Sequence, residues 1–442
     1  MSLDRNPMQV GFGRADVTPV GCVDMAGAPD GMRVSTGNLT PMYVDSIALR
    51  DAEGTMVLMI TADSQFAGKV VCQQARQQLS QSLGIPTAAI AIASTHTHNA
   101  PHPGVEYPYK DQLIGGIVES GKKAVADLAP AKMYGTIVKT ELLNFVRNYI
   151  MNDGSYGGTG YGDHSIGFKA HETDADSDLQ LVKFVREGAK DIVISNFCAH
   201  PHRDYNTPEQ YYKITANVPF IYRQILEKEW DCHAAYFTGA SGNVNLNSRI
   251  EEENITANYE EQGTRLAQYA LSAVDSFRQL SGGRVSYSET MLEVECNHSQ
   301  EHLLPYAQKV IELYEQTGDK KQAKALAREY GMENQVHAAA VLRMAQMDKT
   351  DWMPVQCFRA GEFAFAAMPG EPYDTLGRII KDGAGYAMTF IGYICNVATG
   401  YLPSAETFSH GGYGVYTCRY APGTGELLAQ AFIDGLQKLH EE

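Results

Sequence analysis

The sequence predicts an α/β fold in which mixed central β-sheets are flanked by helices. Apolar runs of strand length, such as residues 55–61 and 88–94, alternate with segments of helical periodicity, such as 69–83. This alternation is typical of α/β architecture. Several expected strands end in polar side chains, and ligand sites in such folds gather at strand ends. The fold class therefore also indicates where to look for a functional site.

The first half of the chain supplies most of the expected sheet. A strand over 55–61 runs into Asp63, and the helix over 69–83 is stopped by Gly84 and Pro86. A long loop is expected over 148–178, because Gly, Asp, Tyr and Ser occur there with little periodicity. The remaining elements expected in this half are a strand at 88–94, helices at 111–128 and 215–228, and strands at 179–185, 191–198 and 234–238.

The second half contains a helical excursion. Residues 301–347 are rich in Ala, Glu, Lys, Leu and Gln and are interrupted near Gly318 and Gly331, which predicts a hairpin or three helices. We expect an insertion packed on the edge of a single domain spanning 1–442. A lid or a dimer contact is the alternative role, so the sequence also allows a homo-oligomer. Strands at 362–368 and 387–394 and a helix at 426–439 complete the chain.

Composition excludes several classes of function. Hydrophobic residues make up 44% of the chain, which is enough for a sizeable core. A net charge of −16, from 36 basic and 52 acidic residues, argues against a nucleic-acid-binding protein. No apolar run is long enough for a transmembrane helix, and residues 1–19 show no secretory signal. With eight cysteines and no Cys-x-x-Cys pair, the expected location is cytoplasmic.

Two His-x-His pairs follow apolar strand-like runs. His96 and His98 come after 88–94, and His200 and His202 come after 192–199. Residues two apart in an extended segment project to the same face, so each pair directs two imidazoles the same way. Zinc or another divalent transition ion suits imidazole nitrogen, and Glu371, after 362–368, adds a carboxylate. Some of these histidines can instead orient ligands, transfer protons or make ordinary hydrogen bonds.

Motifs spread along nearly the whole chain resemble the neutral ceramidase family, the zinc-dependent N-acyl-sphingosine amidases. No single motif is decisive, but they occur in the family's order. They are Gly13-Arg14-Ala15-Asp16-Val17-Thr18-Pro19, Met25-Ala26-Gly27, Ser94-Thr95-His96-Thr97-His98-Asn99-Ala100-Pro101, Asn196-Phe197-Cys198-Ala199-His200, Pro369-Gly370-Glu371 with Leu376-Gly377-Arg378, and the two-tyrosine segment Cys395-Asn396-Val397 to Tyr401 with Tyr413.

The resemblance implies a ligand set and catalytic groups at matching positions. His98 would handle a proton beside the metal, and Tyr413 would donate to the developing oxyanion. Arg147 corresponds more loosely to a family arginine, because the Ser-Pro that follows it in the family is absent. The implied zinc ligands are His96, His200, Glu371 and Tyr401.

The activity implied by the resemblance is zinc-dependent hydrolysis of an N-acyl amide by metal-activated water. Zinc lowers the pKa of bound water from ~15.7 to roughly 7, and a nearby histidine acting on the leaving nitrogen typically adds ~10²–10⁴-fold. The substrate would be a small-molecule or lipid-like acyl amide. Ceramide itself is disfavoured, because a leaderless acidic chain suits a smaller and more soluble compound.

The chain departs from the family pattern at informative positions. Asn245, within Gly242-Asn243-Val244-Asn245-Leu246-Asn247, stands where the family has a serine, which excludes a serine acyl-enzyme at that position. The asparagines there would either orient substrate hydroxyls or satisfy a tight turn. Asn217 stands where an aspartate is expected, and His102 and His202 have no assigned role.

Other functions are also compatible with the sequence. A zinc esterase or lactonase acting on a small soluble substrate would use the same metal chemistry. The metallo-β-lactamase pattern fails, because His96-Thr97-His98-Asn99 continues into Ala100-Pro101. A non-catalytic metal-binding homologue is the alternative from a different class. The joint presence of the expected ligands with Tyr413 argues against it.

Overall fold

The largest sheet in the computed structural model has nine strands. The structure describes residues 8–27, 33–104, 106–201, 207–256 and 258–441. The strands of this sheet are β1 (Gln9–Asp16), β4 (Tyr43–Arg50), β5 (Met56–Ala62), β6 (Ile90–Ser94), β7 (Ala129–Lys139), β12 (Asp178–Arg186), β13 (Ile192–Phe197), β14 (His233–Thr238) and β16 (Arg278–Leu280). Their order is β14-β13-β12-β7-β1-β4-β5-β6, with β16 beside β7. The β5–β6 and β13–β14 pairs are parallel, and the other pairs are antiparallel.

A second, four-stranded sheet packs against the first. Its strands are β17 (Val285–Glu295), β18 (Thr350–Ala360), β19 (Phe363–Ala367) and β21 (Met388–Gly392), in that order, with β19 and β21 parallel. One apolar core joins the facing sides of both sheets, and within it the rings of Phe237 and Phe365 lie 5.6 Å apart. Both sheets therefore bury their inner faces against each other.

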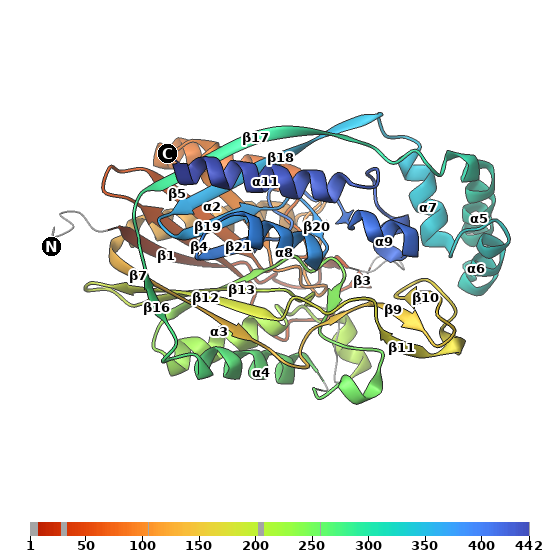
Figure 1. Cartoon of the computed structure of the whole chain (residues 1–442), viewed down its shortest axis with the longest axis horizontal. Helices are drawn as coiled ribbons and strands as arrows, with labels where there is room; N and C mark the ends of the chain where they lie inside the picture. The colour runs from red at the N-terminus through yellow and green to blue at the C-terminus, as the bar shows by residue number, and fades with distance from the viewer. Residues whose placement is uncertain (1–7, 28–32, 105, 202–206, 257, 442) are drawn as a thin grey trace.

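Helices cover the outer faces of the two sheets (Figure 1). The pair α1 (Lys69–Leu83) and α2 (Tyr109–Ala126) packs on β4 to β6. The pair α3 (Val218–Glu229) and α4 (Tyr259–Ser272) packs on β12 to β14. On the second sheet lie α8 (Asp374–Gly383) and α11 (Thr424–Glu441). This layered arrangement confirms the expected class, mixed sheets flanked by helices.

The nine-stranded sheet curls, so that strands from opposite ends of its order approach each other. The Thr238 hydroxyl at the end of β14 donates a 2.7 Å hydrogen bond to the Thr95 carbonyl, just after β6. The Thr61 hydroxyl in β5 donates to the Tyr236 carbonyl in β14 at 2.9 Å. Because β13 runs parallel to β14, the ends of β6 and β13 lie near each other, although the strands are far apart in the sheet order.

The predicted helical excursion is confirmed, whereas the prediction of a long loop over 148–178 is wrong. Three helices form between 301 and 347, α5 (Leu304–Thr317), α6 (Lys320–Glu329) and α7 (Gln335–Met344), and they lie at one end of the molecule (Figure 1). Residues 148–178 instead contain a three-stranded sheet of β9 (Asn148–Met151), β10 (Tyr156–Gly158) and β11 (Phe168–His171). These strands are too short for an alternating pattern to stand out among the glycines.

Smaller elements connect the layers. They are β2 (Asp24–Met25), β3 (Arg33–Val34), β8 (Phe145–Val146), β15 (Val244–Asn245) and α9 (Ala405–His410), with short 3₁₀ turns at Thr87–Ala89, His164–Ile166, Pro208–Tyr212, Glu251–Glu253 and Glu301–Leu303.

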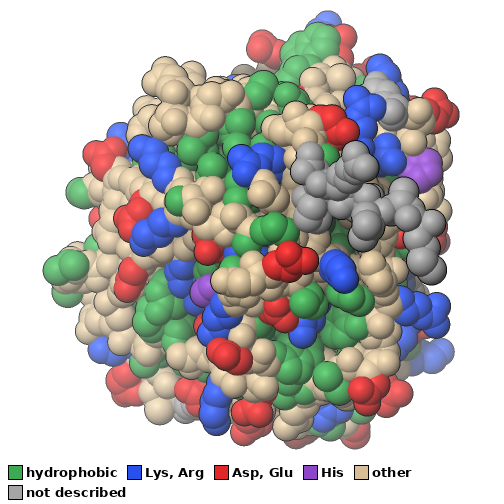
Figure 2. All heavy atoms as spheres, turned by 90° about the vertical axis from the view of Figure 1, so that its left-hand side faces the viewer, with side chains coloured by type: hydrophobic (Ala, Val, Ile, Leu, Met, Phe, Trp, Pro, Cys, Tyr) green, Lys and Arg blue, Asp and Glu red, His purple; other side chains and the backbone are tan. Residues whose placement is uncertain are grey.

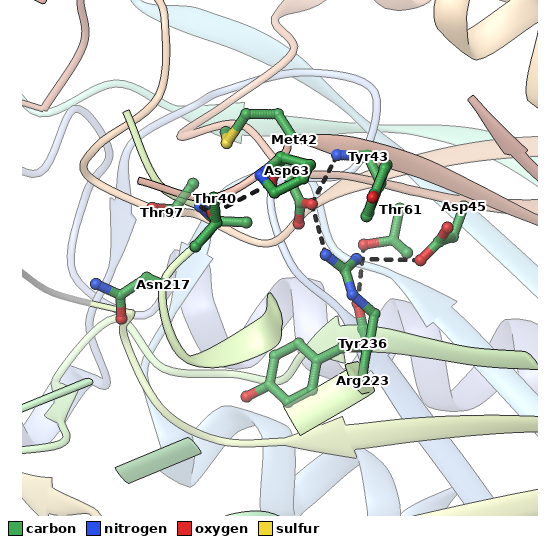
Figure 3. Close-up of polar contacts among 12 residues, drawn as sticks. Thr40, Met42, Tyr43, Asp45, Thr61, Asp63, Thr97, Asn217, Arg223 and Tyr236 are labelled. Carbon is green, nitrogen blue, oxygen red and sulfur yellow. Dashed lines mark hydrogen bonds and ion pairs between the residues drawn. The ribbon is translucent and has the colours of Figure 1, made fainter. Parts of the chain in front are cut away.

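A buried ion-pair network ties α3 to the larger sheet (Figure 3). Arg223 donates to Asp45 at 3.0 Å and to Asp63 at 2.6 Å, and these three side chains are almost completely buried. Arg14 also pairs with Asp45, at 2.6 Å. Asp63 further accepts a hydrogen bond from the Tyr43 backbone N–H. Asp63, although it follows a strand like the histidines do, is therefore held in this network.

Charged side chains of both signs lie on the surface. On the face shown in Figure 2, basic and acidic side chains are interspersed and form no broad basic surface. Among the described residues, no helix has the length and apolar character needed to cross a membrane.

Candidate active site

His96 lies directly after β6 in an unusual backbone conformation. Its φ is +66°, in the left-handed region that non-glycine residues rarely adopt and that is concentrated at functional sites. The backbone N–H of His96 donates to the Ser64 carbonyl at 2.8 Å, and its side-chain Nδ1 lies 2.7 Å from the Gln65 carbonyl oxygen. The loop after β5 thus fixes both the backbone and the ring of His96.

His200 and His98 are held in the same manner. His200 follows β13, is fully buried, and places Nδ1 3.0 Å from the Ser241 carbonyl oxygen. His98 places Nδ1 3.3 Å from the Gly27 carbonyl oxygen. A carbonyl oxygen only accepts, so each Nδ1 carries the proton and each Nε2 presents a lone pair.

The three Nε2 atoms converge on one point. The Nε2 of His96 lies 2.7 Å from that of His200 and 3.1 Å from that of His98. Lone pairs this close repel each other unless a proton or a cation lies between them. Nitrogen ligands of tetrahedral zinc are separated by roughly 3.3 Å, given Zn–N bonds of about 2.0–2.1 Å. The group His96, His98 and His200 therefore fits a metal ion and could hold one.

Glu371 approaches this group from a two-stranded ladder that it shares with Tyr401. Glu371 begins β20 (Glu371–Pro372), Tyr401 begins β22 (Tyr401–Leu402), and the two residues are direct partners in a parallel pair. Glu371 Oε2 lies 3.5 Å from His96 Nε2 and 4.0 Å from His200 Nε2. A carboxylate at this distance can complete a metal site or neutralise its charge.

Arg147 and Tyr413 complete the surroundings of Tyr401. The Arg147 guanidinium carbon lies 5.2 Å from the ring centre of Tyr401 and 5.9 Å from that of Tyr413. Its Nη2 donates to the Gly242 carbonyl at 2.6 Å. Tyr413 starts the short helix α10 (Tyr413–Tyr416), and its ring centre lies 5.6 Å from that of Tyr401. All seven site residues proposed from the sequence therefore lie in one connected region.

Burial dominates the electrostatics of the site. Burial lowers the pKa of His96, while Glu371 opposes that shift, so the imidazole is neutral and its Nε2 is available to a metal. Burial also raises the pKa of Tyr401 well above its usual value, with Arg147 opposing. The phenol of Tyr401 is thus a hydrogen-bond donor unless a cation binds it.

Tyr393 is a site residue that sequence reasoning missed. Its hydroxyl donates to Glu371 Oε2 at 3.1 Å, and its ring packs edge-on against His96 with centres 5.2 Å apart. Its position just after β21 could have identified it, because the neighbouring strand β19 leads to Glu371. His102 lies outside the three-imidazole group and packs on Tyr107, and His202 lies outside the described residues.

Gly242 leaves no room for a side chain beside Glu371. A Cβ on Gly242 would lie 2.4 Å from the Glu371 carbonyl oxygen, which is backbone and cannot move away cheaply. We expect Gly242→Ala to shift Glu371 and Arg147, to cost about 1–3 kcal/mol of unfolding free energy and to lower activity. Denaturant unfolding and metal content measure these effects.

Gly115→Ala is the matched control, because a Cβ there meets nothing within 4 Å and the position lies in α2. Alanine favours a helix over glycine, so this variant should be neutral or slightly more stable. Equal stability of the two variants would contradict the close packing at Gly242.

Comparison with known proteins identifies the fold of this chain. No family model and no curated protein matches the chain. Among solved structures, the neutral ceramidase from Pseudomonas aeruginosa has a TM-score of 0.73 at 16% identity, over 99% of this chain and 75% of that chain. A structure described as ceramidase complexed with C2 has a TM-score of 0.72 at 15% identity, over 99% and 76% of the respective chains. The chain therefore has the neutral ceramidase fold, as its motifs predicted.

Proposed function

From the neutral ceramidase fold of this chain, we propose that it is a metal-dependent hydrolase that cleaves an N-acyl amide. The convergence of three imidazole Nε2 atoms beside Glu371 carries this proposal. Neutral nitrogen donors with fixed rings are the usual ligands of a catalytic transition metal. The substrate class is a small-molecule or lipid-like acyl amide.

The proposed metal is zinc, held by His96, His200, Glu371 and Tyr401. His98 then lies beside the ion as a proton-handling group. The compact imidazole group also allows a second arrangement, in which His98 is the third nitrogen ligand. The metal content of a His98→Ala variant separates the two, because only the second arrangement requires His98 for binding.

Amide cleavage needs an activated nucleophile, a polarised carbonyl and a protonated leaving nitrogen. The bound ion supplies the first two by lowering the pKa of water and acting as a Lewis acid. His98, two residues from His96 and on the same side of the site, can carry a proton to the leaving nitrogen. Its Nδ1 contact with the Gly27 carbonyl keeps Nε2 directed at the reacting groups.

Tyr413 and Arg147 are proposed to stabilise developing negative charge. A phenol hydroxyl from Tyr413 would donate to the oxyanion of the tetrahedral intermediate, an interaction worth on the order of 3 kcal/mol. Arg147 lies within cation–π distance of the Tyr401 and Tyr413 rings and has no carboxylate partner among the described residues. Its charge therefore favours an anion beside the two tyrosines.

The test is metal analysis of the purified protein together with hydrolysis of N-acyl amides of short and long acyl chains. About one zinc per chain, and loss of amide hydrolysis on chelation with recovery on adding zinc, are expected. Matched esters and lactones belong in the same panel, because the metal chemistry alone does not select the amide. Metal-independent amide cleavage, or bound metal without any acyl hydrolysis, would contradict the proposal.

A further inference from the structure

A polar pocket adjoins the candidate active site, and apart from Arg147 its lining residues have no role in the chemistry proposed above. Its volume is about 270 Å³, which suits one small substituent of a substrate. Arg147 forms the wall that it shares with the active site. The lining residues are Arg147, Tyr149, Thr159, Asn245, Asn247, Ser248 and Arg249.

The charge of this pocket is opposite to that of the chain. Among the described residues, two arginines and no acidic side chain line it, although the chain carries 52 acidic and 36 basic residues. Arg249 is exposed, lies 5.8 Å above the Phe168 ring, and makes no ion pair with any described residue. A guanidinium with free N–H donors in a pocket can bind a carboxylate or a phosphate.

Asn245 provides a second and independent indication of a ligand. Its side-chain Oδ1 is buried and has no hydrogen-bond partner among the described residues. Such an atom costs free energy unless a donor reaches it, and a substrate N–H or O–H is such a donor. Asn245 also forms a β-bridge with His200, so the pocket begins directly beside the imidazole group.

We propose that this pocket selects an anionic N-acyl amide, whose carboxylate binds Arg249 while its N–H or O–H donates to Asn245. This inference rests on the proposed function and names its substrate class. The long-range field of a chain with net charge −16 repels anions, so the preference must come from the local arginines. It should therefore depend on Arg249 itself and not on net charge.

The experiment compares N-lauroylglycine with N-lauroylglycinamide, which differ in the carboxylate. Wild-type kcat/KM should be about tenfold or more higher for the acid, the usual value of a charged hydrogen bond in a partly solvated site. Arg249→Gln should remove that preference with metal content unchanged. Arg278→Gln, which removes an exposed arginine on β16, should keep it. A monoamide of a dicarboxylic acid shows whether the charge belongs to the acyl half.

Binding gives a readout that does not need turnover. Calorimetry with N-lauroylglycine in the presence of inhibitory chelator should show weaker binding to Arg249→Gln than to wild type or Arg278→Gln. Equal binding by the three proteins, together with equal kcat/KM for the acid and the amide, would contradict the anion site. That result would not contradict amide hydrolysis. Tight, Arg249-dependent binding without hydrolysis would support the pocket and contradict the proposed function.

Discussion

His200→Ala is expected to remove bound metal and to lower amide hydrolysis by at least about a thousandfold. His200 is fully buried, and its Nε2 lies 2.7 Å from that of His96. Alanine removes one of the few nitrogen donors of the proposed site, and the methyl group that replaces the imidazole cannot bind a metal ion. Loss of metal-activated water removes the nucleophile, because water without the ion has a pKa near ~15.7. Metal analysis and initial rates measure both effects.

His302→Ala is the matched control, since His302 is exposed in the helical excursion and far along the chain from the site. It should keep both metal and activity. His98→Ala is the informative intermediate, with metal kept and activity lost if His98 handles a proton. Full metal content in His200→Ala would show that the imidazole group is not the metal site.

Arg223→Met is expected to cost about 3–5 kcal/mol of unfolding free energy, or to prevent folding. Arg223 is the only described cation that pairs with Asp63, and it also pairs with Asp45, with all three side chains almost fully buried. Methionine keeps much of the volume but leaves buried carboxylates with less compensation. Equilibrium denaturation measures the loss.

Two further variants test whether unpaired charge is the cause. Asp63→Asn combined with Arg223→Met should recover part of the loss, because one buried charge disappears with its partner. Lys190→Met breaks the exposed pair with Asp231 and should change stability by no more than about 0.5 kcal/mol. An Arg223→Met protein as stable as wild type would contradict a stabilising role of the ion-pair network in Figure 3.

Local sequence patterns predicted the helices and strands that have a clear apolar run or a clear terminating residue. The helix over 69–83 has the bounds of α1, because Gly84 ends it with a φ of +69°. The strands before His96 and His200 were equally clear, since both are mostly apolar runs that are buried on both faces. The sheet within 148–178 had no such signal, because Gly157, Gly158 and their neighbours form very short strands.

The geometry of the site depends on contacts that no local pattern contains. His96 and His200 meet because the larger sheet curls, and hydrogen bonds such as Thr238 to Thr95 join segments 143 positions apart. Their tautomers depend on the carbonyls of Gln65 and Ser241, which any residue could supply. Backbone partners leave no trace in side-chain identity, so the sequence could name the imidazoles but not their arrangement.

The most direct test of the central claim is anomalous diffraction at the zinc absorption edge from crystals of the metal-loaded protein. We expect one strong peak within about 2.0–2.2 Å of the Nε2 atoms of His96 and His200 and of a Glu371 carboxylate oxygen. A peak bound to other side chains, or no peak in protein that hydrolyses N-acyl amides, would contradict it.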